Sequence, residues 1–495
     1  MHQQNAIVIG SGVAGLAVAI RLASQGYQVS VYEKNLFPGG KLHSFEKDGF
    51  HFDAGPSLFT QPQNIVDLFA DAGERLEDYL TWEPVPLSCR YFFENGKQLD
   101  AFTDAGKLAE EMHHQLGEDA ATVTSYLNQS EKLYEHVGKV FLNHSLHKKN
   151  TWLHPRVTKA LSTVQYPHLF STLHKYNVAR FRTPEAVQFF DRFATYNGSD
   201  PYQAPAMLSL IPHLEINEGT FYPHGGMVSI TEALYKLAQK KGVQFHFNQP
   251  IERILYHESK VRGVVVDSEN IPASIVVSNA DVYFTYKHLL KDDTLAAKVL
   301  RQERSSSAVI FYWGMRKSFP RLHLHNLFFG KNYEQEFDHI FKKGSVTDDP
   351  TIYINITSKL EVAMAPAGKE NWFVMINVPA NKGQDWHTLK TELREAVIQK
   401  LSRMLAEDIA PQIETELTLD PVSIEAQSAS FMGSLYGTSS NSKMAAFMRQ
   451  ANESKQVKGL YFCGGSVHPG GGIPLCLKSA VIVSDLVKAA KQSNH

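Results

Sequence analysis

Cysteine is scarce in this chain, which contains only Cys89, Cys463 and Cys476. No two of them form a CxxC pair, and none belongs to a cysteine and histidine cluster with the spacing of a zinc site. The sequence therefore predicts neither a disulfide framework nor a metal centre. Such cysteine usage is typical of a protein in a reducing cytoplasm.

Long apolar runs are missing as well. No uncharged apolar stretch reaches the roughly 18 residues that a membrane-spanning helix needs, so we expect no transmembrane helix. The first strand-like run, Ala6 to Ile9, begins almost at Met1 and leaves no room for a signal peptide ahead of it. We expect a cytoplasmic protein whose contact with lipid is limited to peripheral contact on the inner face of the cell membrane.

Neither sign of charge is in excess. The chain has 49 Lys and Arg against 51 Asp and Glu, a formal net charge of −2, and a pI near 6.9. These values give no general electrostatic reason to bind nucleic acid. The 43% of hydrophobic and 20% of charged residues are typical of a soluble globular protein. Because 495 residues exceed what one core usually holds, we expect two or three lobes that can enclose a ligand.

What the sequence does contain begins with a βαβ unit at its N-terminus. Strands are expected at Ala6–Ile9 and Val29–Tyr32, with a helix at Val13–Gln25 between them. The connecting segment Gly10-Ser11-Gly12-Val13-Ala14-Gly15 matches the GxGxxG pattern, and Glu33 follows at the end of the second strand. This context makes an ordinary turn a poor explanation of the match.

Each element of this motif has a physical role in binding a dinucleotide. Gly10 makes the tight turn, Gly12 lets the backbone approach a pyrophosphate, and Gly15 lets helix and strand pack closely. The pyrophosphate then meets the unpaired N–H groups and the positive end of the helix dipole. Glu33 can accept hydrogen bonds from ribose hydroxyls, and its charge would repel a 2′-phosphate.

The motif alone does not distinguish FAD from NAD. Pro38-Gly39-Gly40-Lys41 supplies a second glycine pair where the backbone can approach a cofactor, and Gly55-Pro56-Ser57 supplies a third tight element. Together they favour a larger ligand that is held from two sides. For Gly39-Gly40 taken alone, a plain turn explains the pattern nearly as well.

The most informative stretch runs from Gly459 to Pro474. A strand, Gly459 to Cys463, leads into a segment with five glycines and two prolines between Gly464 and Pro474, and a helix follows from Ile473 to about Lys491. Pro474 is expected at the first helical position. The N–H groups of such a helix would face the pyrimidine edge of a flavin, where negative charge collects on reduction.

Dinucleotide-type segments thus occur at both ends and in the middle of the chain. The predicted fold is α/β, with a discontinuous Rossmann-like FAD-binding domain, a mixed β-sheet substrate domain, and a helical subdomain that serves as a lid or faces a membrane. The expected boundaries are 1–85, 222–290 and 455–495 for the FAD domain, 86–103 and 291–454 for the substrate domain, and 104–221 for the helical subdomain.

These segments resemble the bacterial carotenoid desaturases, a family of FAD-dependent oxidoreductases that includes phytoene and hydroxycarotenoid desaturases. The matching segments are spread over nearly the whole chain in the expected order. They are Ile7 to Gly15 with Glu33, Pro38 to Lys41, Asp53 to Ser57, Thr195 to Gly198 with Pro201 and Ala204 to Ala206, Tyr222 to Met227, Val277 to Asp281, and Gly464 to Pro474. Two positions depart from the usual pattern, with Val467 in place of Thr or Ala and Lys41 in place of Arg.

The resemblance implies an enzyme that introduces C=C bonds into a polyene by hydride transfer to the flavin. It implies FAD held by the two glycine-rich ends and the segments between them. The implied cofactor-binding residues are Gly10, Gly12, Val13, Ala14, Gly15, Glu33, Lys34, Gly39, Gly40, Lys41, Gly55, Pro56, Ser57, Ile251, Asn279, Gly464, Gly465, Gly472, Ile473 and Pro474. The implied partners are a hydrophobic carotenoid, and oxygen or a quinone as electron acceptor.

No catalytic residue is assigned from the sequence. A polyene delocalises developing positive charge, so positioning and exclusion of water matter more than a strong base. Glu215, Asp200 and His224 are candidate proton acceptors, each with a structural or solvated role as the stronger explanation. His323 and His325 have metal-like proximity without a third ligand, and an edge of a strand explains them better.

A basic segment from His144 to Lys159 surrounds Trp152 and includes Lys148, Lys149 and Arg156. It predicts either an interfacial patch that takes substrate from a bilayer or a solvated helix. For the activity itself, 3,4-desaturation of a 1-hydroxylated carotenoid and phytoene desaturation are close alternatives. An amine-oxidase-like flavoenzyme and a non-catalytic prenyl-lipid-binding protein of the same fold are more distant ones.

Overall fold

The computed structural model describes residues 4–152, 156–442 and 449–492, and its first layer is a five-stranded parallel sheet. Three separate parts of the chain supply its strands, which lie in the order β19-β13-β1-β2-β9. The central strands of this sheet are buried on both faces, so they consist of short apolar runs with a turn at each end. Their bounds are β1 Asn5–Ile9, β2 Gln28–Tyr32, β9 Gln244–His246, β13 Ile275–Ser278 and β19 Leu460–Phe462.

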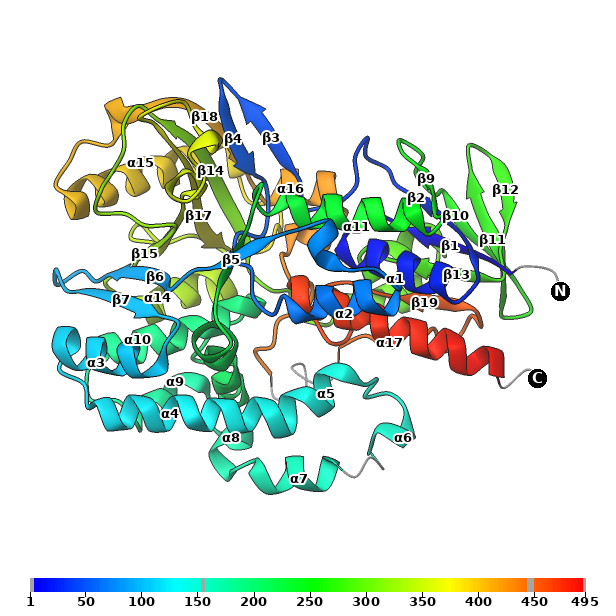
Figure 1. Cartoon of the computed structure of the whole chain (residues 1–495), viewed down its shortest axis with the longest axis horizontal. Coiled ribbons are helices and arrows are strands. Elements are labelled where there is room, and N and C mark those ends of the chain that lie inside the picture. Colours follow the sequence, from blue (N-terminus) through cyan, green and yellow to red (C-terminus); the bar gives the residue numbers. More distant parts are fainter. Residues whose placement is uncertain (1–3, 153–155, 443–448, 493–495) are drawn as a thin grey trace.

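Helices from both ends of the chain cover one face of this sheet. Helix α1 (Val13–Ser24) packs along α17 (Ile473–Gln492) and α11 (Val228–Lys240), and α2 (Gln63–Asp71) contacts both α1 and α17 (Figure 1). The expected βαβ unit and the C-terminal strand and helix are therefore present. Pro474 occupies the second position of α17 rather than the first, which still lies in the turn that tolerates proline.

The opposite face carries a small antiparallel sheet of three strands and two short helices. This layer closes a second apolar core that contains Ile7, Ile9, Val276 and Phe462. The bounds are β10 Arg253–His257, β11 Lys260–Val266, β12 Glu269–Pro272, α12 Val282–Phe284 and α13 Asp293–Leu300.

The second large layer is a mixed seven-stranded sheet in the order β18-β14-β17-β16-β15-β6-β7. Its interior strand β14, the second in this order, is buried along its whole length. One pairing is parallel, between β15 and β6, and the others are antiparallel. The bounds are β6 Leu87–Phe92, β7 Gln98–Phe102, β14 Ser307–Met315, β15 His325–Phe328, β16 Ile352–Asn355, β17 Glu370–Val378 and β18 Ile413–Leu419.

Helix α15 (Trp386–Leu405) covers one face of the seven-stranded sheet (Figure 1). It begins at Trp386 because the Asp385 carboxylate caps it, accepting from the N–H groups of His387 and Thr388. The hairpin of β3 (Ser44–Lys47) and β4 (Phe50–Asp53) packs on the other face, with Phe50 and Phe52 against Tyr312 and Phe373. That face turns toward the parallel sheet.

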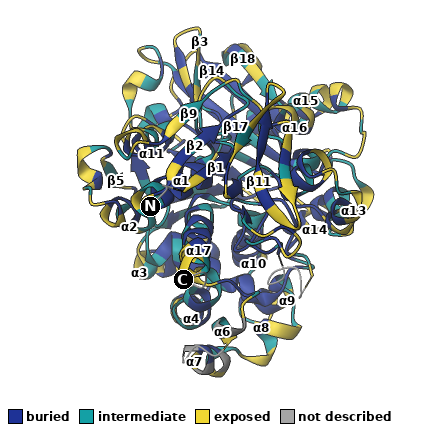
Figure 2. Ribbon diagram, turned by 90° about the vertical axis from the view of Figure 1, so that its right-hand side faces the viewer, coloured by how far each residue is buried: buried dark blue, intermediate teal, exposed yellow. Residues whose placement is uncertain are grey.

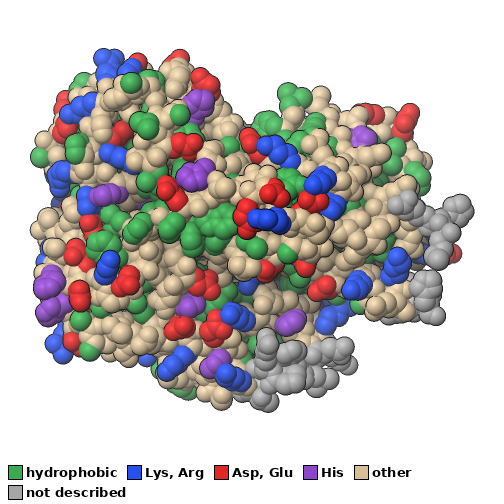
Figure 3. Space-filling model, in the orientation of Figure 1, with side chains coloured by type: hydrophobic (Ala, Val, Ile, Leu, Met, Phe, Trp, Pro, Cys, Tyr) green, Lys and Arg blue, Asp and Glu red, His purple; other side chains and the backbone are tan. Residues whose placement is uncertain are grey.

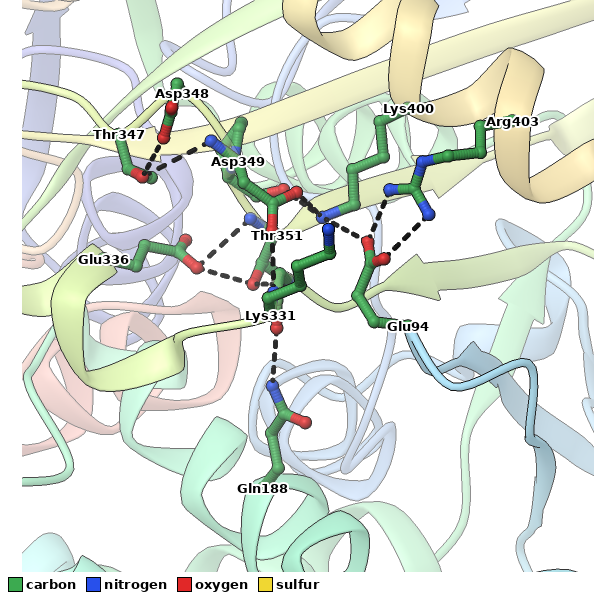
Figure 4. A network of polar contacts seen from close by, with 12 residues as sticks. Glu94, Gln188, Lys331, Glu336, Thr347, Asp348, Asp349, Thr351, Lys400 and Arg403 are labelled. Carbon is green, nitrogen blue, oxygen red and sulfur yellow. Dashed lines mark hydrogen bonds and ion pairs between the residues drawn. The ribbon is translucent and has the colours of Figure 1, made fainter.

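A polar network joins helix α15 to strands and loops of the seven-stranded sheet (Figure 4). The buried Lys400 ammonium lies 2.8 Å from Asp349 Oδ1 and 3.6 Å from Glu94 Oε1, and Arg403 makes a bidentate pair with the same Glu94. Glu94 follows β6, so the network anchors the β6–β7 hairpin to a helix about 300 residues later. Beside it, buried Glu336 accepts from the backbone N–H of Thr351 at 3.1 Å and from the hydroxyl of Thr351.

The helical subdomain occupies the stretch between residues 105 and 191 (Figure 1, cyan). Prolines open two of the helices here: Pro184 is the first residue of α10, and Pro167 lies in the first turn of α8. Pro155 lies outside the described residues. The bounds are α3 Ala105–Leu116, α4 Ala120–Leu133, α5 Lys139–Asn143, α6 Lys149–Trp152, α7 Arg156–Thr163, α8 Tyr166–Phe170, α9 Leu173–Val178 and α10 Pro184–Asp191.

The remaining elements link these parts. They are β5 Trp82–Pro84, which pairs with β8 Phe221–Pro223, together with α14 Tyr333–Phe337 and α16 Pro421–Ser428. The predicted α/β fold class, with its discontinuous parallel sheet, mixed sheet and helical part, is confirmed. The domain boundaries stay a prediction.

The molecular surface and its helices agree with the composition. In the described part of the chain, no helix combines the length and apolarity needed to cross a membrane. Acidic and basic side chains are intermixed over the face in Figure 3, as the near-zero net charge predicts. Figure 2 shows that the strands at the centre are mostly buried, while exposed residues gather on the outer turns and helices.

Candidate functional site

Four segments meet at one edge of the parallel sheet because each follows a strand at its carboxyl end. Across the sheet, in order, Cys463 follows β19, Asn279 follows β13, Gly10 follows β1 and Glu33 follows β2. The crevice outside the carboxyl ends of parallel strands is where α/β proteins bind nucleotides. The sequence-predicted segments from both termini are therefore brought together.

Asn279 is the point where the two glycine-rich segments touch. A Cβ on Gly12 would lie 2.7 Å from Asn279 Oδ1, and a Cβ on Gly464 would lie 2.5 Å from Asn279 Nδ2. The same amide donates a hydrogen bond of 3.2 Å to the carbonyl of Cys463. Only glycine fits at both contact positions, so the N-terminal and C-terminal segments form one continuous backbone surface.

The start of α1 has the features of an anion site. Gly10 has a φ of +89° and its N–H donates to the carbonyl of Tyr32, which makes the sharp turn after β1. Gly15 packs on this turn, where a Cβ would come within 2.1 Å of the Gly10 oxygen. In the described chain no side chain caps α1 at Gly12, so its first N–H groups are available to a phosphate.

Glu33 is buried, and backbone and hydroxyl groups fix its carboxylate. Its Oε2 accepts from the N–H of Ser11 at 2.8 Å and from the hydroxyl of Ser11 at 2.9 Å, and its Oε1 accepts from the N–H of Asn35 at 2.9 Å. A carboxylate offers about four acceptor positions, so capacity for a ribose hydroxyl remains. Lys34 points elsewhere, with its ammonium donating to the carbonyl of Ala426.

The second glycine pair lies directly on the first motif. Gly39 forms a bridge with Gly12, and its N–H donates to the carbonyl of Ser11 at 2.9 Å, so Gly40 lies beside the α1 turn. Gly55 packs so closely on Lys41 that a Cβ would lie 1.9 Å from the Lys41 oxygen. These contacts connect three predicted segments into one clasp, in which Pro56 is exposed.

Lys41 crosses from this clasp to the C-terminal half of the chain. Its ammonium donates to the carbonyls of Ser434, at 3.4 Å, and Leu435, at 3.1 Å. Burial lowers the pKa of Lys41 to about 8, and the charge of Asp281 opposes that shift. The position that departs from the usual arginine therefore carries an amine that titrates close to physiological pH.

The C-terminal glycine loop has a packed side and an open side. A Cβ on Gly471 would lie 2.8 Å from the ring of Tyr436, and a Cβ on Gly465 would lie 3.3 Å from Gly471. Gly472, just before α17, has a φ of +98° and nothing within 4 Å of a Cβ. The open side is therefore at the start of the helix, where the sequence predicts the flavin edge.

Several predicted cofactor residues can contribute only their backbone, because their side chains are buried in the apolar cores. They are Val13, Ala14, Ile251 and Ile473. Val467, the other departure from the family pattern, is 1% exposed and packs in the same core as Phe462. Its side chain therefore does not face a substrate.

The clasp also includes Asp53, which lies in the family-like segment Asp53 to Ser57 but has no role predicted from the sequence. Asp53 accepts from the N–H groups of Met227 at 2.8 Å and Val228 at 3.0 Å and so caps α11. Burial raises the pKa of its carboxyl to about 6, although both hydrogen bonds oppose the shift. The only sign of this role in the sequence is the position of an acid immediately before Ala54-Gly55.

The three candidate proton acceptors have structural surroundings. Glu215 is 1% exposed, accepts from the Ser88 hydroxyl at 2.5 Å, and lies 3.7 Å from the Arg192 guanidinium. Burial raises the pKa of Glu215, and Arg192 opposes that effect. These contacts favour a packed ion pair over a free base.

The surroundings of Asp200 and His224 do not favour a role as proton acceptor either. Asp200 accepts from the N–H of Tyr202 and the amide of Gln203, which makes it the organiser of a local turn. His224 is exposed at the surface. His325 begins β15, which is an interior strand between β16 and β6, so the expectation of a strand edge was wrong.

Comparisons with known proteins agree with this geometry. Residues 13–488 match the model of the flavin containing amine oxidoreductases. The chain belongs to this family. It is an oxidoreductase and its cofactor is FAD, as predicted. The uncapped α1, the glycine surface around Asn279 and the fixed carboxylate of Glu33 suit that nucleotide.

Relatives of known name extend over the whole chain. It is 46% identical over 484 residues to a 1-hydroxycarotenoid 3,4-desaturase of Flavobacterium sp. strain P99-3, covering 98% of this chain and 99% of that protein. It is 33% identical to a 4,4'-diaponeurosporene oxygenase of Staphylococcus aureus strain MSSA476, with 99% of both chains covered. The resemblance to the carotenoid desaturases is therefore confirmed.

A solved structure shares the fold. An oxidoreductase of Methanosarcina mazei has a TM-score of 0.64 and 16% identity, with 98% of this chain and 100% of that chain covered. At this identity the likeness supports the fold alone. The roles of the individual cofactor-binding residues stay a prediction that the geometry makes specific.

Proposed function

We propose that the protein is a carotenoid desaturase that forms the 3,4 double bond of a 1-hydroxylated carotenoid. The observation that carries the proposal is the convergence of both glycine-rich segments on Asn279. The 46% identity to a 1-hydroxycarotenoid 3,4-desaturase over nearly the whole chain supports the choice of substrate. Desaturation of phytoene is the alternative that the test below must distinguish.

The residues of the chain divide the work of binding and positioning. FAD, when bound, supplies the acceptor for a hydride from the substrate. The N–H groups at the start of α1 would neutralise its pyrophosphate, Glu33 would hold its ribose, and the start of α17 would face its pyrimidine edge. Asn279 lies between the segments that precede α1 and α17 and would hold them at a fixed separation.

On the sheet face that carries Tyr312 and Phe373, the partly exposed side chains of Tyr353 and Met375 would contact the polyene. Aromatic rings give a large apolar contact area, and a dry environment favours transfer of a hydride from an allylic C–H. The second hydrogen leaves the neighbouring carbon as a proton. Glu215 is committed to Arg192 and Ser88, so we assign it to structure and not to this proton.

The test is conversion in cells that make the substrates. The chain would be expressed in one strain that accumulates phytoene and in another that accumulates a 1-hydroxylated carotenoid, and pigments would be separated by chromatography. We expect a red-shifted product only in the second strain, and none with the Gly15→Val variant. A product from phytoene alone would select the alternative, and a flavin-loaded protein that changes neither pigment would overturn the proposal.

We further propose peripheral contact with the inner face of the cell membrane through the outer edge of the helical subdomain. Exposed apolar side chains occur on α6, where Trp152 is 52% exposed, and on α8, where Tyr166 is 75% and Phe170 55% exposed. Both helices lie along the lower edge of the molecule in Figure 1. Lys148 pairs with Glu453 at 2.6 Å, which reduces its value as a free lipid contact. The side chains of Lys149 and Arg156 lie outside those described.

Flotation with anionic liposomes tests this contact. The triple variant Trp152→Ser, Tyr166→Ser, Phe170→Ser should lose most liposome binding, because aromatic residues supply interfacial affinity. A matched variant with Leu360→Ser and Val362→Ser, which are exposed elsewhere, should bind as the wild type does. Equal binding by all three proteins would contradict the proposal.

A further inference from the structure

A line of hydrogen-bonded side chains runs from the glycine clasp into the seven-stranded sheet. The Ser57 hydroxyl, which follows Gly55-Pro56, lies 2.8 Å from the hydroxyl of Tyr353 on β16. The same Tyr353 hydroxyl lies 2.8 Å from Nδ1 of His325 on β15. Ser57 and Tyr353 keep partial exposure, whereas His325 is 2% exposed. The line therefore has an accessible end at the clasp and a buried end inside the sheet.

The partners of His325 give the line a direction. The Asn355 amide donates to the carbonyl of Leu324 at 3.2 Å, and the same nitrogen lies 3.1 Å from His325 Nδ1. Because an amide N–H can only donate, we assign Nδ1 as an acceptor and place the ring proton on Nε2. Burial and the nearby Arg192 lower the pKa of His325 to about 3, so the ring is neutral at physiological pH.

With Nδ1 as acceptor, each hydroxyl along the line donates inward. Tyr353 donates to His325, and Ser57 donates to Tyr353. The lone pairs of the Ser57 oxygen then remain at the accessible end. The line thus presents a hydrogen-bond acceptor, and it selects a ligand group that donates.

This arrangement is unfavourable for stability, which points to a role in binding. His325 Nε2 is buried and has no hydrogen-bond partner among the described residues. Such a group costs about 1–3 kcal/mol, whereas apolar side chains of the same shape would avoid that cost. The same sheet face also carries the apolar side chains of Tyr312, Phe373 and Met375. A polar line through this face is unnecessary for packing.

The position of the line matches the geometry of the proposed reaction, on which this inference rests. In a 1-hydroxylated carotenoid a single carbon, C2, separates the carbon that bears the hydroxyl from C3. The hydroxyl must therefore enter the site together with the bond that is oxidised. Ser57 belongs to the clasp that we assign to FAD, so its oxygen lies on the side of the sheet where that bond would be held.

We propose that Ser57 and Tyr353, with His325 as a positioning residue, accept the hydrogen bond of the substrate's hydroxyl and select hydroxylated over unmodified carotenoid ends. A hydroxyl that leaves water and finds no hydrogen-bond partner in the site makes the binding free energy less favourable by about 1–3 kcal/mol. The Ser57 acceptor replaces the lost water partner and removes this cost for the hydroxylated end. The same acceptor gives no gain to an alkene or alkane end.

The experiment compares three substrates of equal chain length with the purified flavin-loaded enzyme. They carry a hydroxyl, a methyl ether or a hydrogen at C1. We would measure kcat/KM, and the dissociation constant from the perturbation of the flavin spectrum. The wild type should prefer the hydroxyl substrate at least about tenfold over both others, because a methyl ether cannot donate to Ser57.

Single variants then locate this preference. Ser57→Ala and Tyr353→Phe should remove most of it by lowering kcat/KM for the hydroxyl substrate alone, with every rate expressed per bound flavin because Ser57 also belongs to the predicted FAD segment. His325→Leu should act similarly, and His325→Gln, which keeps an acceptor, should restore part of the preference. The matched control is Tyr312→Phe, since Tyr312 lies on the same face and donates to the carbonyl of Ala54 at 2.7 Å. It should leave the ratio between substrates unchanged.

The outcomes distinguish a failure of this inference from a failure of the proposed function. An unchanged ratio in Ser57→Ala and Tyr353→Phe, or an equal loss for all three substrates, would overturn this inference while leaving the proposed function in place. A wild type that neither binds nor converts any of the three would overturn the proposed function and the inference with it.

Discussion

The side-chain amide of Asn279 donates to the carbonyl of Cys463, so a residue from the middle of the chain ties down the start of the C-terminal glycine loop. Asn279 also separates Gly12 from Gly464. Asn279→Ala should lower FAD affinity at least about tenfold, because it removes this bond and opens a gap between the two glycine segments. Flavin retained per chain after dialysis measures the effect. Asn270→Ala, on the exposed strand β12, should retain as much flavin as the wild type does.

A second prediction separates backbone strain from blocked contact. Gly464 and Gly73 both have positive φ values, +104° and +73°, so an alanine at either is strained by about 1–2 kcal/mol. A Cβ on Gly464 would lie 2.5 Å from Asn279, whereas one on Gly73 meets nothing within 4 Å. Gly464→Ala should therefore lose flavin while Gly73→Ala keeps it. Equal flavin content in the two purified variants would argue against a shared cradle.

A third prediction concerns the network of Figure 4. Lys400→Met should lower the free energy of unfolding by about 3 kcal/mol, because it leaves Asp349 and Glu94 without their buried partner. The Arg403 side chain is 51% exposed, so Arg403→Met should cost about 1 kcal/mol or less. Denaturant titration of both variants at one pH provides the comparison. A larger loss for Arg403→Met would show that the network is organised differently.

A fourth prediction follows from Glu336, whose pKa burial raises to about 7 from an ordinary 4.5. The folded state therefore binds this proton more tightly than the unfolded chain does. Its contribution to stability is fully present below about pH 4.5 and is lost as the pH rises toward 7, by at most about 3 kcal/mol. In Glu336→Gln this loss should disappear, so the difference in unfolding free energy between wild type and variant should change across that window. A constant difference from pH 5 to pH 8 would contradict the assignment.

Local patterns predicted the strands, turns and helices of the cofactor segments, while the roles of their individual residues stay a prediction. The turn at Gly10, the helix that follows it and Glu33 belong to one βαβ unit, so their arrangement depends on neighbours within about 30 residues. The segment from Gly459 to Pro474 was equally readable, apart from the place of Pro474 one position later in α17. In these segments, short-range sterics largely fix the backbone.

The substrate side was less predictable because it depends on pairings between distant strands. The line from Ser57 to His325 exists only because β15 lies beside β16, and nothing near His323 or His325 in the sequence indicates it. Glu215 is an ordinary acid in the sequence, and its neutralisation by Arg192 appears only after folding. Burial of a polar residue is a tertiary property, so pattern reasoning gave the candidates without separating them.

The order of strands has a consequence for synthesis on the ribosome. Strand β6 pairs with β15, so an early hairpin must wait for more than 200 later residues before its open edge is covered. Unpaired edges of this kind promote association between chains. The parallel sheet is completed even later, when β19 has left the ribosome and can pair with β13. The nucleotide site is therefore complete only after β19 has been made, and the yield in cells should respond to chaperone supply more than to the supply of flavin before that point.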